Sequence, residues 1–154
     1  MKPGPRLIGP LYRPVDPTTL VGVASDGSRG DAYRLTQSTA VAARALILAA
    51  EAEGHAIGIA SGYRTPEHQE RLFARAVAKY GSEKDARRWV AKFSEHATGQ
   101  TIDWNLGIQN SSENASSGAF AALPAWQWLA EHAPKMGWTP YEREPWHWTF
   151  NPVS

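Results

Sequence analysis

The chain contains no cysteine among its 154 residues. This absence excludes disulfide bonds and every metal site built on thiolates, so a zinc ion in this protein would have to be held by histidine, aspartate or glutamate. It does not fix the compartment, because a protein of this size can be stable without disulfides in any of them.

The chain also has little net charge and no long apolar run. Sixteen Lys and Arg residues against fifteen Asp and Glu residues leave a formal charge of +1, so we expect neither nucleic acid nor an anionic membrane as a partner. No apolar run approaches the roughly 20 residues that span a bilayer. The charged start is followed by prolines and does not read as a secretory signal. We therefore expect a protein that stays in the cytoplasm, leaves by another route, or has a leader that is missing from this chain.

The composition itself is that of a folded protein, with 42% hydrophobic and 20% charged residues. We find no internal repeat and no linker, and the length is about that of one ordinary domain. The sequence therefore predicts a single domain over residues 1–154, in which residues 1–19 form an extended, proline-rich segment. Helical and strand patterns do not alternate regularly along the chain, which favours an α+β fold.

Hydrophobic periodicity and capping residues predict the individual elements. Strands are expected at residues 20–24, 32–35, 55–60 and 100–104, and a strand pair, or one strand bent at Pro140 or Pro145, at residues 138–150. Helices are expected from the cap Ser38 to about Glu53, from the cap Thr65 to about Tyr80, from the cap Ser82 to about Phe93, and over residues 119–134. Residues 105–118 are expected to form a polar loop.

Residues 94–103 read Ser-Glu-His-Ala-Thr-Gly-Gln-Thr-Ile-Asp and place a histidine and an aspartate seven positions apart. If the chain turns at Gly99, His96 and Asp103 can point back to a common centre. Taken alone this pattern is weak, because histidine and aspartate occur together in many loops and Asp103 could simply cap a turn.

A second histidine, His147, lies three residues after Glu144. Pro145 disfavours a helix at Glu144, so this is not the helical zinc-protease motif. An extended segment could place His147 on a metal ion while Glu144 reaches the water bound to it. Two histidines and one aspartate leave the fourth position of a tetrahedral zinc ion open, which is typical of catalytic sites. Such a zinc lowers the pKa of its water to about 7, and a nearby carboxylate can take the proton.

Arg64 lies in the segment Ser-Gly-Tyr-Arg-Thr, between an expected strand and an expected helix. Its guanidinium could stabilise a developing oxyanion or bind a substrate carboxylate. The alternative for Arg64 is a structural ion pair. For Glu144 the alternative is a role as a metal ligand or as an orienting group.

Residues 61–65, 94–103 and 144–147 occur in an order that resembles the D-alanyl-D-alanine carboxypeptidases of the VanY and VanX type. This group includes phage L-alanyl-D-glutamate endopeptidases, and the resemblance covers residues 35–150. It implies an α+β fold with a small antiparallel sheet flanked by helices, as in the hedgehog domains and the D-Ala-D-Ala peptidases.

The resemblance also implies roles for single residues. It makes His96, Asp103 and His147 the ligands of one Zn²⁺ ion per chain, Glu144 the general base and later the acid, and Arg64 the group that stabilises the tetrahedral intermediate. Substrate contacts are implied for Arg64, Gln69, Ser94 and Trp146, with Trp146 as a wall beside the metal. Two positions depart from the common pattern: Thr101 replaces a small apolar residue, and Trp104 follows the aspartate where an aliphatic residue is usual. Trp104 could therefore reshape the floor near the metal.

The function implied by the resemblance is a zinc peptidase that hydrolyses peptidoglycan stem peptides, first of all as a D-alanyl-D-alanine carboxypeptidase. We expect the protein to be a monomer. One alternative is an L-alanyl-D-glutamate endopeptidase of the phage-lysin kind. Another is a non-catalytic zinc-binding interaction domain, because the hedgehog domains are similar to this family. The presence of Glu144 beside His147 argues against the non-catalytic alternative.

Overall fold

The computed structural model describes residues 14–88, 90 and 94–151. Its helices are α1 (Gln37–Ala52), α2 (Pro66–Tyr80), α3 (Glu83–Ala86), α4 (Ser112–Ser116) and α5 (Pro124–His132), with short 3-10 turns η2 (Pro17–Thr19), η3 (Glu95–Thr98) and η4 (Ala133–Met136). Its strands are β1 (Val21–Val23), β2 (Tyr33–Leu35), β3 (Gly58–Ser61), β4 (Thr101–Asn105), β5 (Trp138–Tyr141) and β6 (Glu144–Phe150).

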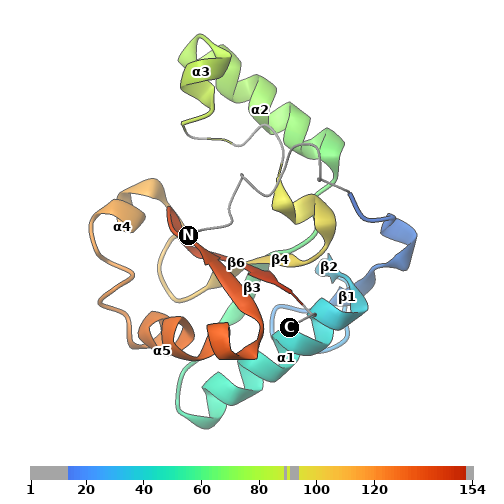
Figure 1. Cartoon of the computed structure of the whole chain (residues 1–154), viewed down its shortest axis with the longest axis vertical. Helices are drawn as coiled ribbons and strands as arrows, with labels where there is room; N and C mark the ends of the chain where they lie inside the picture. The colour runs from blue at the N-terminus through green and yellow to red at the C-terminus, as the bar shows by residue number, and fades with distance from the viewer. Residues whose placement is uncertain (1–13, 89, 91–93, 152–154) are drawn as a thin grey trace.

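The strands form two antiparallel sheets. A four-stranded sheet has the order β3-β4-β6-β5, and β1 pairs with β2 in a separate two-stranded sheet. Figure 1 shows the larger sheet near the centre, with α1 and α5 on one side of the molecule and α2 and α3 projecting on the other. The predicted α+β class, a small antiparallel sheet flanked by helices, is confirmed. Within the described residues, none of the helices has the length and apolar character needed to cross a membrane.

Strands β4 and β6 separate the apolar core from the polar face of the sheet. Ile102 pairs with Trp148 across the two strands, and both side chains are buried in the main core. Because successive side chains of a strand point to opposite faces, the neighbouring pair Asp103 and His147 lies on the other face. The register of these two strands therefore places a carboxylate directly opposite an imidazole.

The main core joins α1, α5 and the sheet in one cluster. Ala43 and Leu46 of α1 and Leu129 of α5 are fully buried in it, together with residues of β3, β4 and β6. Trp104 also belongs to this core and packs edge-on against Trp138 at 5.6 Å between ring centroids. Trp104 therefore lies on the core face of β4, opposite to Asp103, and does not form a floor at the predicted metal site.

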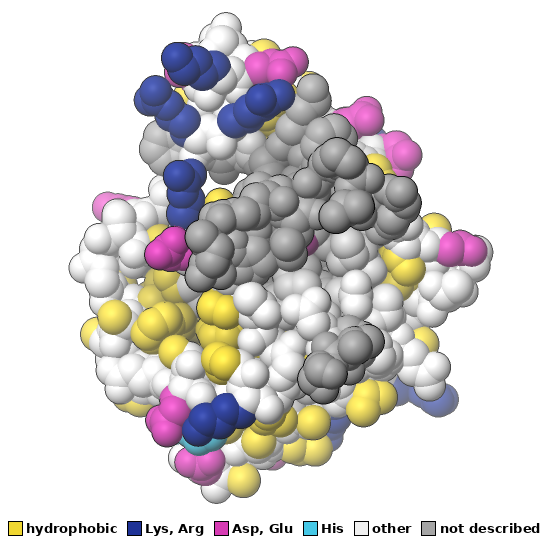
Figure 2. Space-filling model, in the orientation of Figure 1, with side chains coloured by type: hydrophobic (Ala, Val, Ile, Leu, Met, Phe, Trp, Pro, Cys, Tyr) yellow, Lys and Arg dark blue, Asp and Glu magenta, His cyan; other side chains and the backbone are white. Residues whose placement is uncertain are grey.

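Helices α2 and α3 pack against each other around a small core of their own, formed by Phe73, Ala76 and Ala86. The predicted cap of α2 is confirmed, because Thr65 accepts a hydrogen bond from the backbone N–H of His68 at 3.0 Å. Gly81 ends the helix with φ of +93°, as predicted. Lys and Arg side chains gather over this pair of helices (Figure 2), as expected for a solvated helix face.

Three of the predicted helices have different ends. Helix α1 is capped by Thr36 and not by Ser38, because Thr36 has the extended backbone of a cap and accepts from the N–H of Thr39 at 3.2 Å. Helix α3 ends already at Ala86, and residues 89 and 91–93 of the predicted helix lie outside the described residues. Helix α5 begins only at Pro124, since proline lacks an N–H and fits the first helical position.

Three further segments differ from the sequence prediction, and the last segment agrees with one of its two predicted forms. The loop at residues 105–118 contains α4, which begins because Ser111 accepts from the N–H of Asn114. The predicted strand pair at residues 138–150 is confirmed, with its turn at residues 142–143 and a register shift beside Pro140. Strand β3 is shorter than predicted and ends at Ser61. Of the N-terminal segment predicted as extended, residues 1–13 lie outside the described residues, and Pro17–Thr19 form a 3-10 turn capped by Asp16.

The turn η3 is held from three sides by backbone hydrogen bonds. The carbonyl of Ala97 accepts from Val15 N at 3.0 Å, that of Gly99 from Thr36 N at 2.9 Å, and that of His96 from Arg64 N at 3.1 Å. Gly99 ends the turn with φ of +74°. A Cβ atom at this position would lie 2.8 Å from the buried Leu20 side chain. The predicted turn at Gly99 is thus confirmed, and it leads directly into β4.

We predict that Gly99→Ala lowers the free energy of unfolding by about 2–3 kcal/mol, because it combines positive-φ strain with steric overlap. Gly81→Ala is the matched control. Gly81 has the same sign of φ, but a Cβ there meets nothing within 4 Å, so we expect a loss of only about 1 kcal/mol. Urea unfolding of both variants measures the difference. Equal losses would show that packing around η3 does not restrict Gly99.

Candidate metal centre

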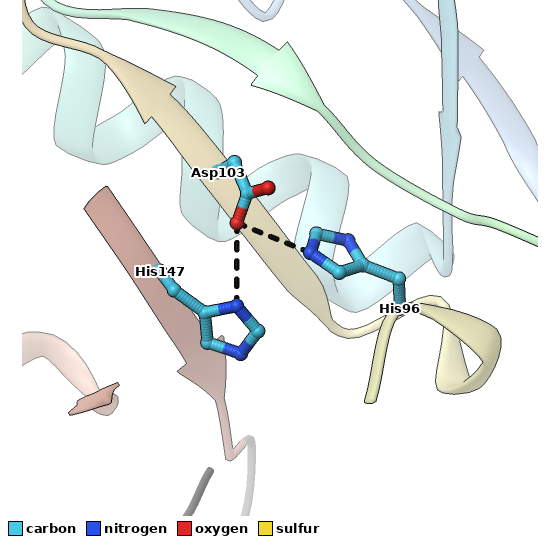
Figure 3. Close-up of side chains that lie close together, drawn as sticks. All are labelled: His96, Asp103 and His147. Carbon is cyan, nitrogen blue, oxygen red and sulfur yellow. Dashed lines mark hydrogen bonds and ion pairs between the residues drawn. The ribbon is translucent and has the colours of Figure 1, made fainter. Parts of the chain in front are cut away.

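Three side chains converge on the polar face of the sheet: His96 from η3, Asp103 from β4 and His147 from β6. One donor atom of each lies within 4.8 Å of the other two. His96 Nε2 is 3.1 Å and His147 Nδ1 is 3.3 Å from the same oxygen, Asp103 Oδ1. Figure 3 shows both imidazoles directed at this oxygen. The structure thus brings together the three residues predicted as metal ligands.

His96 is oriented by the turn that carries it. Ser94 caps η3 by accepting from the N–H of His96 at 3.1 Å. The ring nitrogen Nδ1 lies 2.8 Å from the carbonyl oxygen of Gly62. A carbonyl can only accept, so Nδ1 carries the hydrogen and donates. In a neutral ring, Nε2 then presents a lone pair to Asp103.

His147 is oriented in the same way by a carboxylate. Its Nε2 lies 2.9 Å from Oε1 of Glu95, which is buried with 5% exposure. Nε2 therefore donates, and a neutral ring presents the lone pair of Nδ1 to Asp103 and to Glu144. The distance from Nδ1 to Glu144 Oε1 is 3.3 Å.

The facing atoms of the two neutral rings and the carboxylates are all acceptors. Acceptor atoms this close together repel one another unless a cation lies between them. Ligand atoms about 2.0–2.1 Å from a tetrahedral zinc ion lie about 3.3 Å from one another, close to the observed 3.1 and 3.3 Å. Each histidine also has an outer hydrogen-bond acceptor, which is usual for metal ligands. The residues present therefore fit a zinc ion held by two nitrogens and one oxygen.

Without a metal ion, a protonated imidazole supplies the positive charge at the centre. Burial alone would raise the pKa of Asp103, but charge attraction from His96 and hydrogen bonds from both imidazoles hold it well below its ordinary value. Burial alone would lower the pKa of His147, but hydrogen bonds to Asp103, Glu144 and Glu95 raise it well above its ordinary value. The metal-free centre thus favours an Asp103 carboxylate paired with a protonated His147.

Glu144 lies at the open side of the group, with 38% of its side chain exposed. The backbone next to it is fixed by the carbonyl of Pro145, which accepts from the indole N–H groups of Trp126 and Trp148, each at 3.0 Å. Glu144 can therefore reach both the predicted metal position and solvent.

Arg64 forms a polar group with Gln69 and Ser61 beside η3. Its Nη1 donates to Gln69 Oε1 at 3.0 Å and its Nη2 to Ser61 Oγ at 3.4 Å. Its backbone N–H donates to the carbonyl of His96. Both side-chain partners are neutral, so these contacts leave the guanidinium charge uncompensated. The substrate-binding role of Arg64 and Gln69 stays a prediction.

The other two predicted substrate contacts have structural partners. Ser94 is buried and caps η3, as described above. Trp146 lies in the main core and packs against Phe120 at 5.4 Å between ring centroids. A role of Ser94 or Trp146 in binding substrate stays a prediction.

Sequence reasoning missed Glu95 and Tyr141. Glu95 follows Ser94 directly in the motif, but its partner His147 lies 52 positions away, so spacing alone gave no signal. The ring of Tyr141 stands edge-on to His147 at 5.4 Å. Burial and the nearby Glu144 charge raise the pKa of Tyr141. The phenol therefore stays protonated, and its uncharged ring lies beside His147 at the site.

The pKa shifts predict how the stability of the metal-free protein depends on pH. Because its pKa is lowered in the folded protein, the Asp103 carboxylate contributes stability that is lost as pH falls below its ordinary pKa of 3.8. Because its pKa is raised in the folded protein, protonated His147 contributes stability that is complete below its ordinary pKa of 6.5. This stability is lost as pH rises through the pKa of His147 in the folded protein. We therefore expect maximal stability between these limits.

Thermal unfolding with a chelator should show the midpoint falling as pH rises above 6.5. With zinc the trend should reverse, because the metal replaces the proton on His147. Asp103→Asn is the control, and the unfolding midpoint of this variant without metal should change less with pH. A metal-free midpoint that rises between pH 6.5 and 9 would contradict the assigned charges.

The chain is similar to a known protein family and to individual members of it. The family model VanY, described as D-alanyl-D-alanine carboxypeptidase, matches residues 32–153. The protein YodJ of Bacillus subtilis (strain 168) is 30% identical over 126 residues, and the match covers 73% of this chain and 45% of YodJ. The chain spans less than half the length of the curated relatives it matches.

Two solved structures have a similar fold. The LdcB LD-carboxypeptidase superposes with a TM-score of 0.74 at 26% identity, covering 88% of this chain and 69% of LdcB. The vancomycin-resistance D,D-pentapeptidase VanY of a VanB-type cassette, solved with Zn(II), superposes with a TM-score of 0.59 at 24% identity, covering 90% of this chain and 83% of VanY. The chain belongs to the VanY family of D-alanyl-D-alanine carboxypeptidases.

Proposed function

We propose that the protein is a zinc-dependent peptidase that hydrolyses peptidoglycan stem peptides and removes a terminal D-alanine. The observation that carries the proposal is the convergence of His96, Asp103 and His147 with Glu144 beside them. One zinc ion per chain is held by the two histidines and the aspartate. The VanY enzyme solved with Zn(II), which shares the fold, supports this choice of metal.

When bound, zinc lowers the pKa of a water molecule to about 7 and polarises a substrate carbonyl. Glu144 takes the proton from the attacking water, since its carboxylate lies 3.3 Å from the metal-facing nitrogen of His147. The same carboxyl group then returns the proton to the leaving amine. Its 38% exposure leaves room for the substrate to approach.

Arg64 stabilises the negative charge that develops on the carbonyl oxygen, or binds the free carboxylate of the substrate. Its hydrogen bonds to Gln69 and Ser61 fix the plane of the guanidinium. Because its backbone donates to His96 O, its position is tied to that of a metal ligand. Gln69, buried beside it, orients Arg64 and contacts the substrate.

The scissile bond can be identified by product mass. Purified muropeptides with stems that end in D-Ala-D-Ala, or in one D-alanine, are incubated with the zinc-loaded protein. We expect the first to lose one alanine. Loss of alanine only from the shorter stems would indicate an LD-carboxypeptidase, the activity named for LdcB. Release of all residues beyond the first L-alanine would indicate an endopeptidase, and no cleavage would favour a non-catalytic zinc module.

We predict that Glu144→Gln lowers kcat by about 10²- to 10⁴-fold while zinc binding persists, because the amide cannot act as a base. Glu142→Gln is the matched control, since Glu142 is exposed in the turn just before β6. Kinetics on a D-Ala-D-Ala stem peptide and metal content of both variants are measured together. If Glu144→Gln kept normal turnover, the base would have to be another group.

A further inference from the structure

We propose that Glu95 is a positioning residue for the metal centre, which holds His147 in the tautomer and orientation that present Nδ1 to the metal. The inference rests on the zinc site of the proposed function and assigns a role to a residue outside the ligand set. Glu95 would not touch the metal or the substrate, and it would act only through the imidazole of His147.

The burial of Glu95 calls for a specific partner. Its side chain is only 5% exposed, and glutamate is almost never buried to this degree unless it is paired. Among the described residues its Oε1 is bonded to His147 Nε2, whereas Oε2 is buried without a hydrogen-bond partner. An apolar side chain would avoid the cost of burying that second oxygen. The carboxylate therefore fits a role at the metal centre better than a role in packing.

The contact with Glu95 selects one of two neutral forms of His147. With the hydrogen on Nε2, the ring donates to Glu95 and leaves Nδ1 free to bind a metal. With the hydrogen on Nδ1, the ring would instead donate to Asp103 or Glu144, which lie 3.3 Å away. That second form would satisfy the carboxylates and block metal binding. Glu95 thus disfavours the form that closes the site.

The position of Glu95 also links two of the ligands. It directly precedes His96 on η3, although its partner lies on β6. One short turn therefore carries the first imidazole and, through Glu95, orients the second. The two rings stand edge-on at an interplanar angle of 89° with centroids 5.1 Å apart. A movement of η3 would displace both nitrogens together.

Glu95→Met and Glu95→Gln separate this role from packing. Methionine fills a similar volume without an acceptor, whereas glutamine keeps an acceptor oxygen. We expect Glu95→Met to weaken zinc binding by about 10- to 100-fold in a competition titration with a chromogenic chelator. Glu95→Gln should retain most of the affinity. Glu51→Met, an exposed position on α1, is the control and should bind zinc like the unsubstituted protein.

Nitrogen chemical shifts of the His147 ring give a readout that does not depend on activity. In the unsubstituted protein with zinc we expect the hydrogen on Nε2 and the metal on Nδ1. This measurement decides the matter even if Glu95→Met does not fold. Zinc on Nε2, or unchanged affinity in a folded Glu95→Met, would overturn the proposal and leave the peptidase function intact. An unsubstituted protein that binds no zinc would instead contradict the proposed function.

Discussion

The pairing of β4 with β6 is the constraint on which the centre depends. Side chains alternate along both strands, so Asp103 can face His147 only while Ile102 faces Trp148 in the core. A slip by one residue would move every side chain of a strand to the opposite face. The hydroxyls of Thr101 and Thr149, 2.8 Å apart and buried, pair on the same face as the ligands. This hydroxyl pair explains why threonine is accommodated at position 101, where the family pattern commonly has a small apolar residue.

The second constraint is the turn that precedes β4. η3 takes hydrogen bonds from the N-terminal segment, from the start of α1 and from the loop after β3, three segments that are distant in sequence. Gly99 lets the chain reverse at once into the strand. The distance between His96 Nε2 and Asp103 Oδ1, 3.1 Å, is a consequence of this tight reversal. The ligands are thus held by backbone geometry rather than by side-chain packing alone.

The sequence carries local signals for parts of the site, whereas the full set of ligands was implied only by the resemblance to the VanY and VanX type. His96 and Asp103 flank a glycine turn, and Thr65, Pro66 and Gly81 mark helix ends by their own conformational preferences. That two imidazoles and a carboxylate could hold a metal ion follows from side-chain chemistry.

Contacts between distant segments could not be predicted in the same way. Ser38 and Thr36 both have a hydroxyl group that can cap a helix, and the choice of Thr36 goes together with its hydrogen bond to Gly99. The side of β4 on which Trp104 lies depends on its packing against Trp138. Glu95 has a polar side chain in a polar motif, and only the fold reveals that it is buried against His147.

We infer that two imidazoles and one carboxylate hold a single ion through His96 Nε2, Asp103 and His147 Nδ1. A crystal of the zinc-soaked protein, with diffraction data on both sides of the zinc absorption edge, tests it directly. We expect one anomalous peak per chain, about 2.0–2.2 Å from those three atoms. A peak elsewhere, or none in crystals that retain this fold, would contradict it.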